Sequence, residues 1–211
     1  MNIKQNIKLF IPEIFFILIR FILTSFKKNQ LFDGYDQIFK QIISDKTIYG
    51  EYGCGKSTIF VMKNYKIPIY SVDTSKFWID KIQKENNGLL KIKHIDLGEI
   101  GNWGRPKSYK YRNNFLRYIN WIWEQKSKPN VILIDGRFRV GCFLTSLKLS
   151  DEGTKIIFDD YVAREHYHIV EEFLKPVQSN ERQALFIVPN KSTLDIKNIE
   201  LEINKFSYVM D

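Results

Sequence analysis

Short apolar runs alternate with amphipathic stretches along most of the chain, and this alternation predicts an α/β fold. The clearest run, residues 131–134, is apolar at every position, which is typical of a parallel strand covered on both faces. The predicted strands cover a short run from Thr47, then residues 67–72, 89–95, 131–134, 155–158 and 184–188, with a further β-rich stretch at residues 199–209. The predicted helices cover residues 32–44, 57–64, 74–84, 111–125, 138–149 and 165–174. This order predicts a three-layer Rossmann-like sheet, mostly parallel with an antiparallel C-terminal strand.

The beginning of the chain differs from the rest, which divides it into an N-terminal helical segment, residues 1–44, and a Rossmann-like domain, residues 45–211. Residues 14–19 are all apolar, but charged residues and a proline interrupt the run on both sides. A bilayer span needs about 20 mostly apolar residues, so this segment is too short to cross a membrane. Two expectations stay open: a basic helix in peripheral contact with a membrane through residues 1–28, or a helix packed on the domain or across a homodimer contact.

A glycine-rich turn, residues 50–57, joins the first predicted strand to a helix with the sequence Gly-Glu-Tyr-Gly-Cys-Gly-Lys-Ser. Glycine is needed where the backbone takes a positive φ or passes close to a ligand. The helix that follows presents free N–H groups, which favour a nucleotide or nucleoside site. Read as a phosphate loop, the turn would place Lys56 on phosphate and Ser57 on magnesium.

The same letters also resemble the first motif of the class I S-adenosylmethionine-dependent methyltransferases, with Glu51, Gly53 and Gly55 at its key positions. The downstream spacing favours this second interpretation. The predicted strand at residues 67–72 is followed by Asp73, about 20 positions beyond the turn, where Rossmann-type folds carry the acidic ligand of a ribose. A carboxylate accepts hydrogen bonds from a ribose diol but repels a triphosphate. The helix after the turn is also short for a phosphate loop.

The third predicted strand ends at Asp96, which is expected on the same edge of the sheet as Asp73. Asp96 either binds the adenosine edge of a cofactor or caps the next turn. Residues 98–112 then lack any periodicity and carry aromatic and basic side chains. Long loops of this kind in compact domains are usually functional or disordered. The composition of the loop suits a sugar, phosphate or acidic substrate.

Three more aspartates follow two predicted strands: Asp135 comes after one, and Asp159 and Asp160 come after the next. If these strands are neighbours, the three carboxylates meet at one edge. Converging carboxylates raise one another's pKa unless a cation stabilises them, and magnesium needs few protein oxygen ligands. A magnesium site is therefore predicted. The alternative is a helix cap and a salt bridge with an arginine, and the candidate arginines are Arg137, Arg139 and Arg164.

From residue 42 onward the order of motifs resembles a class I S-adenosylmethionine-dependent methyltransferase. The motifs are Glu51-Tyr-Gly-Cys-Gly, Ser71-Val-Asp73, Ile95-Asp96, Ile134-Asp135-Gly136 and Phe158-Asp159-Asp160-Tyr161. The last resembles the Asp-Asp-Tyr of metal-dependent O-methyltransferases of the catechol and sugar-modifying types. The resemblance implies S-adenosylmethionine at Glu51, Gly53, Gly55 and Asp73, and magnesium at Asp135, Asp159 and Asp160. Ser57 and Asp96 are further expected cofactor residues, Asp135 is the expected base, and His166 or His168 are weaker candidates for it. Lys56, the loop at residues 98–112 and the Asp-Gly-Arg-Phe-Arg sequence depart from that family's pattern.

The resulting hypothesis is O-methylation of a small-molecule or sugar-like hydroxyl. Two alternatives stay open: a phosphate-loop NTPase or kinase that uses residues 50–57, and a non-catalytic Rossmann-like binding protein. The chain carries 32 Lys and Arg against 24 Asp and Glu, and this net charge of +8 favours anionic partners. No nucleic-acid module is recognisable. Cys54 and Cys142 form no metal pattern and are expected as reduced thiols in a cytoplasmic protein, membrane-associated if residues 1–28 lie on a bilayer.

Overall fold

The computed structural model describes residues 30–211, so the predictions made for residues 1–28 lie outside the described residues. The chain divides into two units, Met1–Asp36 and Gln37–Asp211. This division falls before the segment boundary expected from the sequence. The described part of the first unit contains a short 3-10 turn, η1 (Leu31–Gly34). Across the described part of the chain, no helix combines the length and the apolar character needed to span a bilayer.

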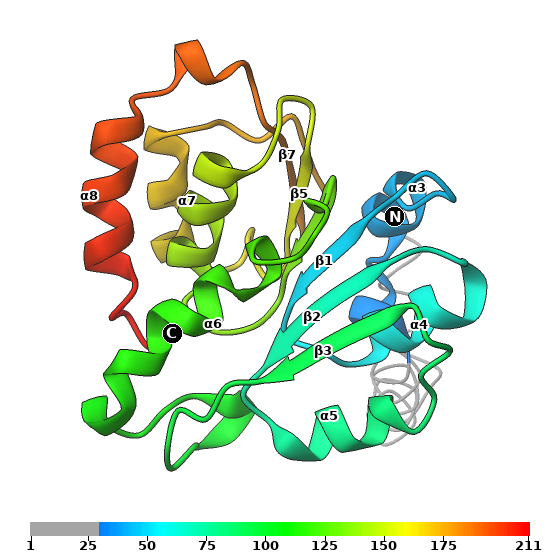
Figure 1. Ribbon diagram of the computed structural model, residues 1–211. Helices are drawn as coiled ribbons and strands as arrows, with labels where there is room; N and C mark the ends of the chain where they lie inside the picture. Colours follow the sequence, from blue (N-terminus) through cyan, green and yellow to red (C-terminus); the bar gives the residue numbers. More distant parts are fainter. Residues whose placement is uncertain (1–29) are drawn as a thin grey trace, which may run out of the picture. The chain divides into compact units, whose positions relative to one another are not determined.

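Seven strands of the second unit form one sheet in the order β3-β2-β1-β4-β5-β7-β6 (Figure 1). The strands are β1 (Tyr49–Tyr52), β2 (Ile69–Asp73), β3 (Leu90–His94), β4 (Val131–Ile134), β5 (Lys155–Phe158), β6 (Gln178–Ser179) and β7 (Ala184–Ile187). Strands β1 to β5 pair in parallel, and β7 pairs antiparallel with β5 and β6. The predicted Rossmann-like sheet is confirmed. Its order reverses between β1 and β4, and ligands of such sheets bind outside the carboxyl ends of the strands at this point.

Helices cover both faces of the sheet and complete the three layers (Figure 1). The helices are α3 (Gln37–Ile42), α4 (Lys56–Asn64), α5 (Lys76–Gln83), α6 (Phe115–Asn120), α7 (Arg139–Leu149) and α8 (Ile196–Phe206). In Figure 1, α4 and α5 lie on one side of the sheet, and α6, α7 and α8 lie on the other. Short 3-10 segments connect them: η2 (Asn102–Gly104), η3 (Tyr109–Asn114), η4 (Trp121–Trp123), η5 (Glu165–Glu172) and η6 (Lys191–Thr193).

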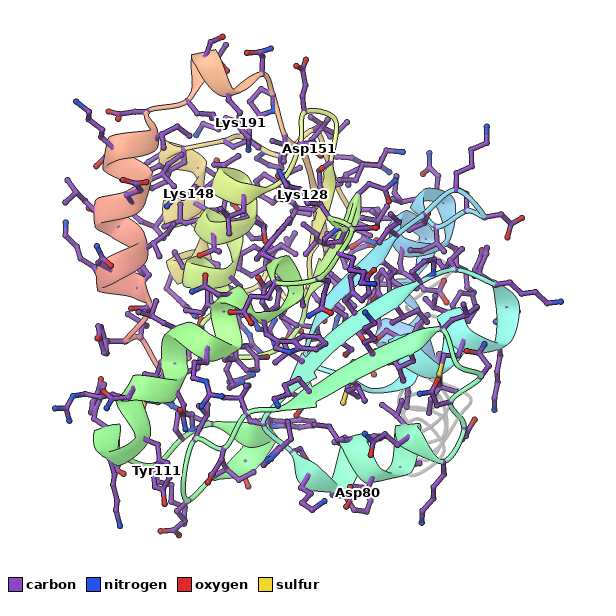
Figure 2. The ribbon with its side chains drawn as sticks, viewed as in Figure 1. Asp80, Tyr111, Lys128, Lys148, Asp151 and Lys191 are labelled. Atoms are coloured by element: carbon purple, nitrogen blue, oxygen red, sulfur yellow. The ribbon has the colours of Figure 1, made fainter. Side chains whose placement is uncertain are left out.

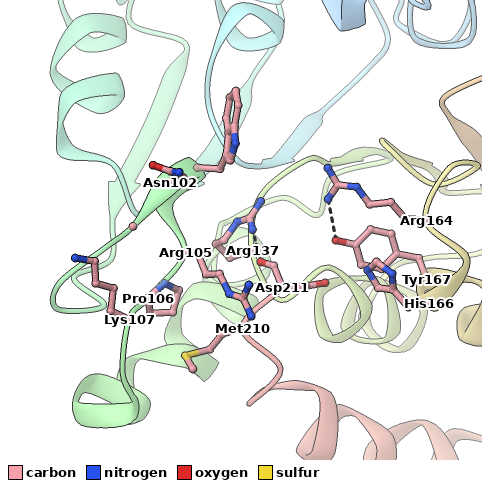
Figure 3. Close-up of a pocket in the computed structure, with 12 residues that line it drawn as sticks. Asn102, Arg105, Pro106, Lys107, Arg137, Arg164, His166, Tyr167, Met210 and Asp211 are labelled. Atoms are coloured by element: carbon pink, nitrogen blue, oxygen red, sulfur yellow. Dashed lines mark hydrogen bonds between the residues drawn. The ribbon is translucent and has the colours of Figure 1, made fainter.

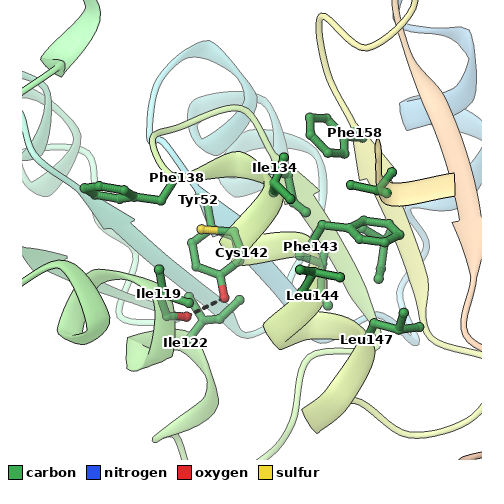
Figure 4. Close-up of a cluster of buried hydrophobic side chains, with 14 of the residues drawn as sticks. Tyr52, Ile119, Ile122, Ile134, Phe138, Cys142, Phe143, Leu144, Leu147 and Phe158 are labelled. Carbon is green, nitrogen blue, oxygen red and sulfur yellow. Dashed lines mark hydrogen bonds between the residues drawn. The ribbon is translucent and has the colours of Figure 1, made fainter. Parts of the chain in front are cut away.

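Buried aromatic side chains fix α7 against the sheet (Figure 4). The ring of Phe143 in α7 lies 4.8 Å from the ring of Phe186 in β7 and 6.1 Å from that of Phe158 in β5. All three side chains are fully buried, and burial of each contributes roughly 1.5–3 kcal/mol. The hydroxyl of Tyr52 in the same cluster donates a 2.6 Å hydrogen bond to the main-chain oxygen of Ile119. Strand β1 is thereby tied to α6.

Charged side chains connect the C-terminal part of α7 to later segments (Figure 2). Lys148 forms a 2.9 Å ion pair with Glu200 of α8. The ammonium group of Lys191 donates to the main-chain oxygen of Leu147, one of the last carbonyl groups of the helix. Both contacts place positive charge near a helix C-terminus, where it is favourable.

The prediction of a β-rich stretch at residues 199–209 is wrong, because α8 occupies most of these residues. The alternation of Ile199, Leu201 and Ile203 suggested a strand, but Leu201 is 61% exposed while Ile199 is buried. The side chain of Asp195 accepts a hydrogen bond from the nitrogen of Asn198 and so caps the start of the helix. The antiparallel C-terminal strand exists, but it is β7.

Two predicted helices are interrupted. Residues 32–44 form η1 and then α3, because Phe32, Asp33 and Gly34 take positive φ values of 49°, 54° and 91°, which no α-helix contains. Residues 111–125 are divided among η3, α6 and η4. Aromatic and β-branched residues such as those of η4 have low helix propensity, so packing decides their local form.

Candidate functional site

The glycine turn packs backbone to backbone against the loop that follows β4. Gly53 has a φ of +92°, and a Cβ atom there would lie 2.7 Å from both the oxygen of Asp135 and the Cα of Gly136. A Cβ atom on Gly136 would lie 2.0 Å from the hydroxyl of Tyr118 and 2.8 Å from the nitrogen of Gly53. Neither position has room for a side chain. A Cβ atom on Gly55 would meet nothing within 4 Å, so the turn is open on that side.

Glu51 and Ser57, both predicted to bind a cofactor, lie beneath the turn. Glu51 is fully buried, and Ser57 is 4% exposed. The carboxylate of Glu51 accepts hydrogen bonds from four hydroxyls, those of Tyr49, Ser57, Thr58 and Ser71. Burial raises the pKa of Glu51 to about 7, although the four hydrogen bonds act in the opposite direction. Glu51 therefore joins β1, α4 and β2, and it supports the turn from below.

Asp73 at the end of β2 is bonded directly to the glycine turn. Its Oδ2 accepts a 2.7 Å hydrogen bond from the nitrogen of Cys54, and its Oδ1 accepts a 2.6 Å hydrogen bond from the nitrogen of Ser75. The side chain is nearly buried, and burial raises its pKa above the usual value. Two carboxylate oxygens offer about four acceptor positions. Asp73 therefore keeps capacity for the two hydroxyls of a ribose.

These contacts argue against a phosphate loop. Residues 49–52 belong to β1, so only three residues separate the strand from α4. The hydroxyl of Ser57, which would have to bind magnesium, donates to Glu51 instead. The helix α4 has nine residues. A turn this short cannot wrap a triphosphate as the longer phosphate loop does.

Asp96 closes the turn that follows β3. Its Oδ1 accepts a 2.8 Å hydrogen bond from the nitrogen of Gly98, and its main-chain oxygen accepts one of 2.8 Å from Asn114. The capping role is thus the one that these contacts support. The carboxylate is exposed and its Oδ2 accepts no hydrogen bond within residues 30–211.

The loop at residues 98–112 folds back toward the end of β2. The hydroxyl of Thr74 donates a 3.0 Å hydrogen bond to the oxygen of Gly104, and Ile100 and Pro106 form a β-bridge. Trp103 takes a φ of +59° and is 90% exposed. A large aromatic side chain this exposed adds nothing to the core, and its positive φ is uncommon for a bulky residue, so Trp103 is a candidate for ligand contact.

Asp135, Asp159 and Asp160 are brought together at the ends of β4 and β5. One oxygen of each lies within 4.8 Å of the others. Their partners are three guanidinium groups, and the ion pairs are Arg139 to Asp135 (3.1 Å) and Asp160 (3.5 Å), Arg164 to Asp160 (2.7 Å), and Arg182 to Asp159 (2.6 Å) and Asp160 (2.9 Å). We call these six residues the Asp–Arg cluster. Asp160 takes a φ of +55°, and these ion pairs hold it there.

Magnesium fits the Asp–Arg cluster poorly. Asp159 is fully buried and accepts four hydrogen bonds, three from Arg182 and one from Gln183. Three carboxylates face three guanidinium groups, so the charge is already balanced. A divalent ion would have to displace hydrogen-bonded arginines, of which Arg139 is buried. The magnesium site stays a prediction from the sequence, and the geometry favours the salt-bridge alternative.

Asp135 differs from the other two aspartates because its side chain remains 30% exposed. Its Oδ1 accepts a 3.1 Å hydrogen bond from Arg139. Partial burial raises the pKa of Asp135 well above its usual range, the charge of Asp159 adds to the shift, and Arg139 opposes it. A carboxylate with a raised pKa and an exposed edge is suited to accept a proton.

The two candidate histidines have different surroundings. His166 is exposed, and its ring lies 4.2 Å from the ring of Tyr167. His168 is half-buried, and its Nε2 lies 3.2 Å from the main-chain oxygen of Tyr161. His166 lines a cleft together with residues of the loop after β3 (Figure 3), whereas His168 is held against the protein.

Arg182 and Gln183 bind the buried aspartate, a role that the sequence does not predict. Both lie in the hairpin between β6 and β7, 23 and 24 residues from Asp159. No motif surrounds them, so only the pairing of β7 with β5 brings them to the aspartates.

No family model and no curated protein sequence matches the chain. Among solved structures, a methyltransferase-like protein from Silicibacter pomeroyi matches 77% of this chain and 88% of its own length, with a TM-score of 0.65 and 28% sequence identity. N-methyltransferase NodS from Bradyrhizobium japonicum matches 68% of this chain and 79% of its own, with a TM-score of 0.44 and 14% identity. A putative O-methyltransferase from Klebsiella pneumoniae matches 81% and 64%, with a TM-score of 0.42 and 14% identity. The chain has the fold of the class I S-adenosylmethionine-dependent methyltransferases.

Proposed function

We propose that the protein is an S-adenosylmethionine-dependent methyltransferase that methylates a hydroxyl oxygen of a small, sugar-like molecule, with Asp135 as the base. The observation that carries this proposal is the hydrogen bond from Cys54 in the glycine turn to Asp73. It joins a turn that has open space at Gly55 to a carboxylate with spare acceptor positions, at the carboxyl ends of β1 and β2. A nucleoside cofactor needs both features side by side.

The residues that would hold the cofactor are Gly53, Gly55 and Asp73. Gly53 lets the turn pack against the backbone of Asp135 and Gly136, and Gly55 leaves the turn open toward a ligand. Asp73 would accept hydrogen bonds from the ribose hydroxyls. Glu51 fixes the turn from below, since its four hydroxyl partners come from β1, β2 and α4. When bound, S-adenosylmethionine supplies an electrophilic methyl group on a sulfonium centre.

Asp135 follows β4, next to Gly136, which contacts the glycine turn. A base at this position would accept the proton of the acceptor hydroxyl as the oxygen forms its bond to the methyl carbon and the carbon–sulfur bond breaks. The products are a methyl ether, S-adenosylhomocysteine and a protonated Asp135. Positioning provides most of the rate in such a transfer. Arg139 orients Asp135 through its 3.1 Å hydrogen bond.

Isothermal titration with S-adenosylhomocysteine, and in parallel with ATP and magnesium, tests the proposal. We expect micromolar binding of S-adenosylhomocysteine that Asp73→Asn weakens at least tenfold, because a carboxylate acceptor is lost. Asp80→Asn is the matched control, since Asp80 is exposed on α5 and pairs with Lys76 (Figure 2). Binding of ATP alone would refute the proposal. Binding without methyl transfer to any hydroxylated acceptor would favour the non-catalytic alternative.

A further inference from the structure

A cleft of about 1080 Å³ opens among the loop after β3, the segments after β4 and β5, and residues 210–211 (Figure 3). Its charged lining is mostly positive. The cations are Arg105, Lys107, Arg137 and Arg164, and the acidic side chain among the described lining residues is that of Asp211. A concave surface with an excess of positive charge attracts anionic ligands.

Two of these arginines have hydrogen-bonding capacity left for a ligand. Arg137 is 8% exposed; its Nη1 donates to the main-chain oxygen of Asp211, and its Nη2 donates no hydrogen bond within the described residues. Its Nε is buried and also lacks a partner there. Buried donors without a partner are rare in folded proteins and call for an explanation. Arg105 is exposed, and its side chain forms no ion pair within residues 30–211. Lys107, in contrast, pairs with Glu99.

The cleft leads to the candidate base. Arg164 lines the cleft and donates a 2.7 Å hydrogen bond to Asp160. Asp160 lies in the Asp–Arg cluster, in which one oxygen of each aspartate, including Asp135, lies within 4.8 Å of the others. Arg137 also lines the cleft and follows Asp135 by two residues in the chain, so the cleft borders the loop that carries the candidate base.

We propose that this cleft binds the methyl acceptor through a phosphate or carboxylate group, with Arg105 and Arg137 as its main anchors. Guanidinium groups match both oxyanions with paired hydrogen bonds. The 90% exposed ring of Trp103, which also lines the cleft, offers a flat apolar face for the rest of the acceptor. The acceptor is then an anionic hydroxyl compound with a ring or apolar face. This inference rests on the proposed function, because it assigns the substrate class of that site.

The test titrates the protein, with and without saturating S-adenosylhomocysteine, with inorganic phosphate, glucuronate and glucose. Glucuronate carries a carboxylate that glucose lacks, so this pair measures the effect of the carboxylate. Comparing phosphate with glucuronate shows which of the two oxyanions the cleft prefers. Arg105→Gln removes the guanidinium group of one anchor, and because Arg105 is exposed, the substitution leaves no cavity in the core. Arg117→Gln is the matched control, because Arg117 is exposed on α6 and does not line the cleft. Melting temperatures check that both variants fold.

We expect phosphate or glucuronate to bind at least tenfold more tightly than glucose, and added salt to weaken that binding. Arg105→Gln should weaken anion binding about tenfold, and Arg117→Gln should leave it unchanged. Neither variant should change the affinity for S-adenosylhomocysteine.

Binding of S-adenosylhomocysteine without any preference for the anions would overturn this inference and leave the proposed function standing. An equal loss of S-adenosylhomocysteine affinity in Arg105→Gln would also overturn it, because the arginine would then serve the cofactor. If S-adenosylhomocysteine does not bind at all, both the inference and the proposed function fail.

Discussion

The main-chain nitrogen of Cys54 donates a 2.7 Å hydrogen bond to Oδ2 of Asp73, so the glycine turn and the end of β2 form one unit. The surroundings of Cys54 also disfavour its thiolate. Burial raises the pKa of Cys54 far above its usual value, and the charge of Asp73 adds to the shift. The thiol therefore stays protonated, and the role of Cys54 in the turn rests on its backbone nitrogen.

Gly53→Ala is expected to destabilise the protein by about 2–3 kcal/mol and to abolish cofactor binding. The substitution combines a strained φ of +92° with contacts of 2.7 Å to Asp135 and Gly136. Gly153→Ala is the matched control, because its φ is +81° and its Cβ would meet nothing within 4 Å. Urea unfolding measures the free energy of unfolding of both variants. An equal loss in the two would show that the contact of Gly53 with Asp135 and Gly136 adds nothing to the cost of the strained φ.

Glu51 makes stability depend on pH. Its pKa is about 7 in the folded protein against an ordinary value of 4.5, so between these pH values the folded state binds more protons than the unfolded state. The stabilisation is fully present below pH 4.5 and is lost by about 3 kcal/mol as pH rises through 7. Glu51→Gln should flatten this slope in urea unfolding, whereas Glu99→Gln, at an exposed residue, should keep it. An unchanged slope in Glu51→Gln would assign the pH dependence to another group.

Arg182→Met is expected to cost about 3–5 kcal/mol, because it leaves the fully buried carboxylate of Asp159 without its ion-pair partner. The comparison is Lys205→Met, which removes a 70% exposed member of a surface ion pair with Glu202 and should cost less than about 1 kcal/mol. Thermal unfolding of the two variants gives the difference. A loss as small as that of Lys205→Met would mean that Asp159 is not held as a buried anion.

Magnesium is not expected to change the melting temperature or the activity, because arginines already balance the Asp–Arg cluster. Melting temperature and methyl transfer are measured with magnesium chloride and again after chelation with EDTA, and calorimetric titration measures the binding heat of magnesium. Binding heat that disappears in Asp160→Ala would restore the metal site predicted from the sequence.

Asp135→Asn should lower kcat by a factor of about 100 or more with little change in cofactor affinity, since general base catalysis contributes about this much. In the unchanged protein, kcat should rise with pH as Asp135 loses its proton, and the midpoint should lie well above the usual aspartate pKa. The rise should disappear in Asp135→Asn. A profile that persists in this variant but vanishes in His166→Gln would move the base to His166.

The sequence by itself determined the parallel sheet and the place of the glycine turn. Strands β4 and β5 have the predicted bounds, because buried parallel strands are apolar at every position and that pattern is local. Gly53 and Asp73 could be found for a similar reason: a turn with positive φ and the residue that ends a strand are both encoded within a few positions.

Only the tertiary structure decided which side chains form ion pairs with the three aspartates. Whether three aspartates hold a metal or meet arginines depends on Arg182, which reaches Asp159 only because β7 pairs with β5. Helix α8 formed where alternation suggested a strand, because packing on α7 and the cap at Asp195 outweighed the local pattern. Ion pairing and burial depend on distances between segments far apart in the chain, and spacing along the sequence does not encode those distances.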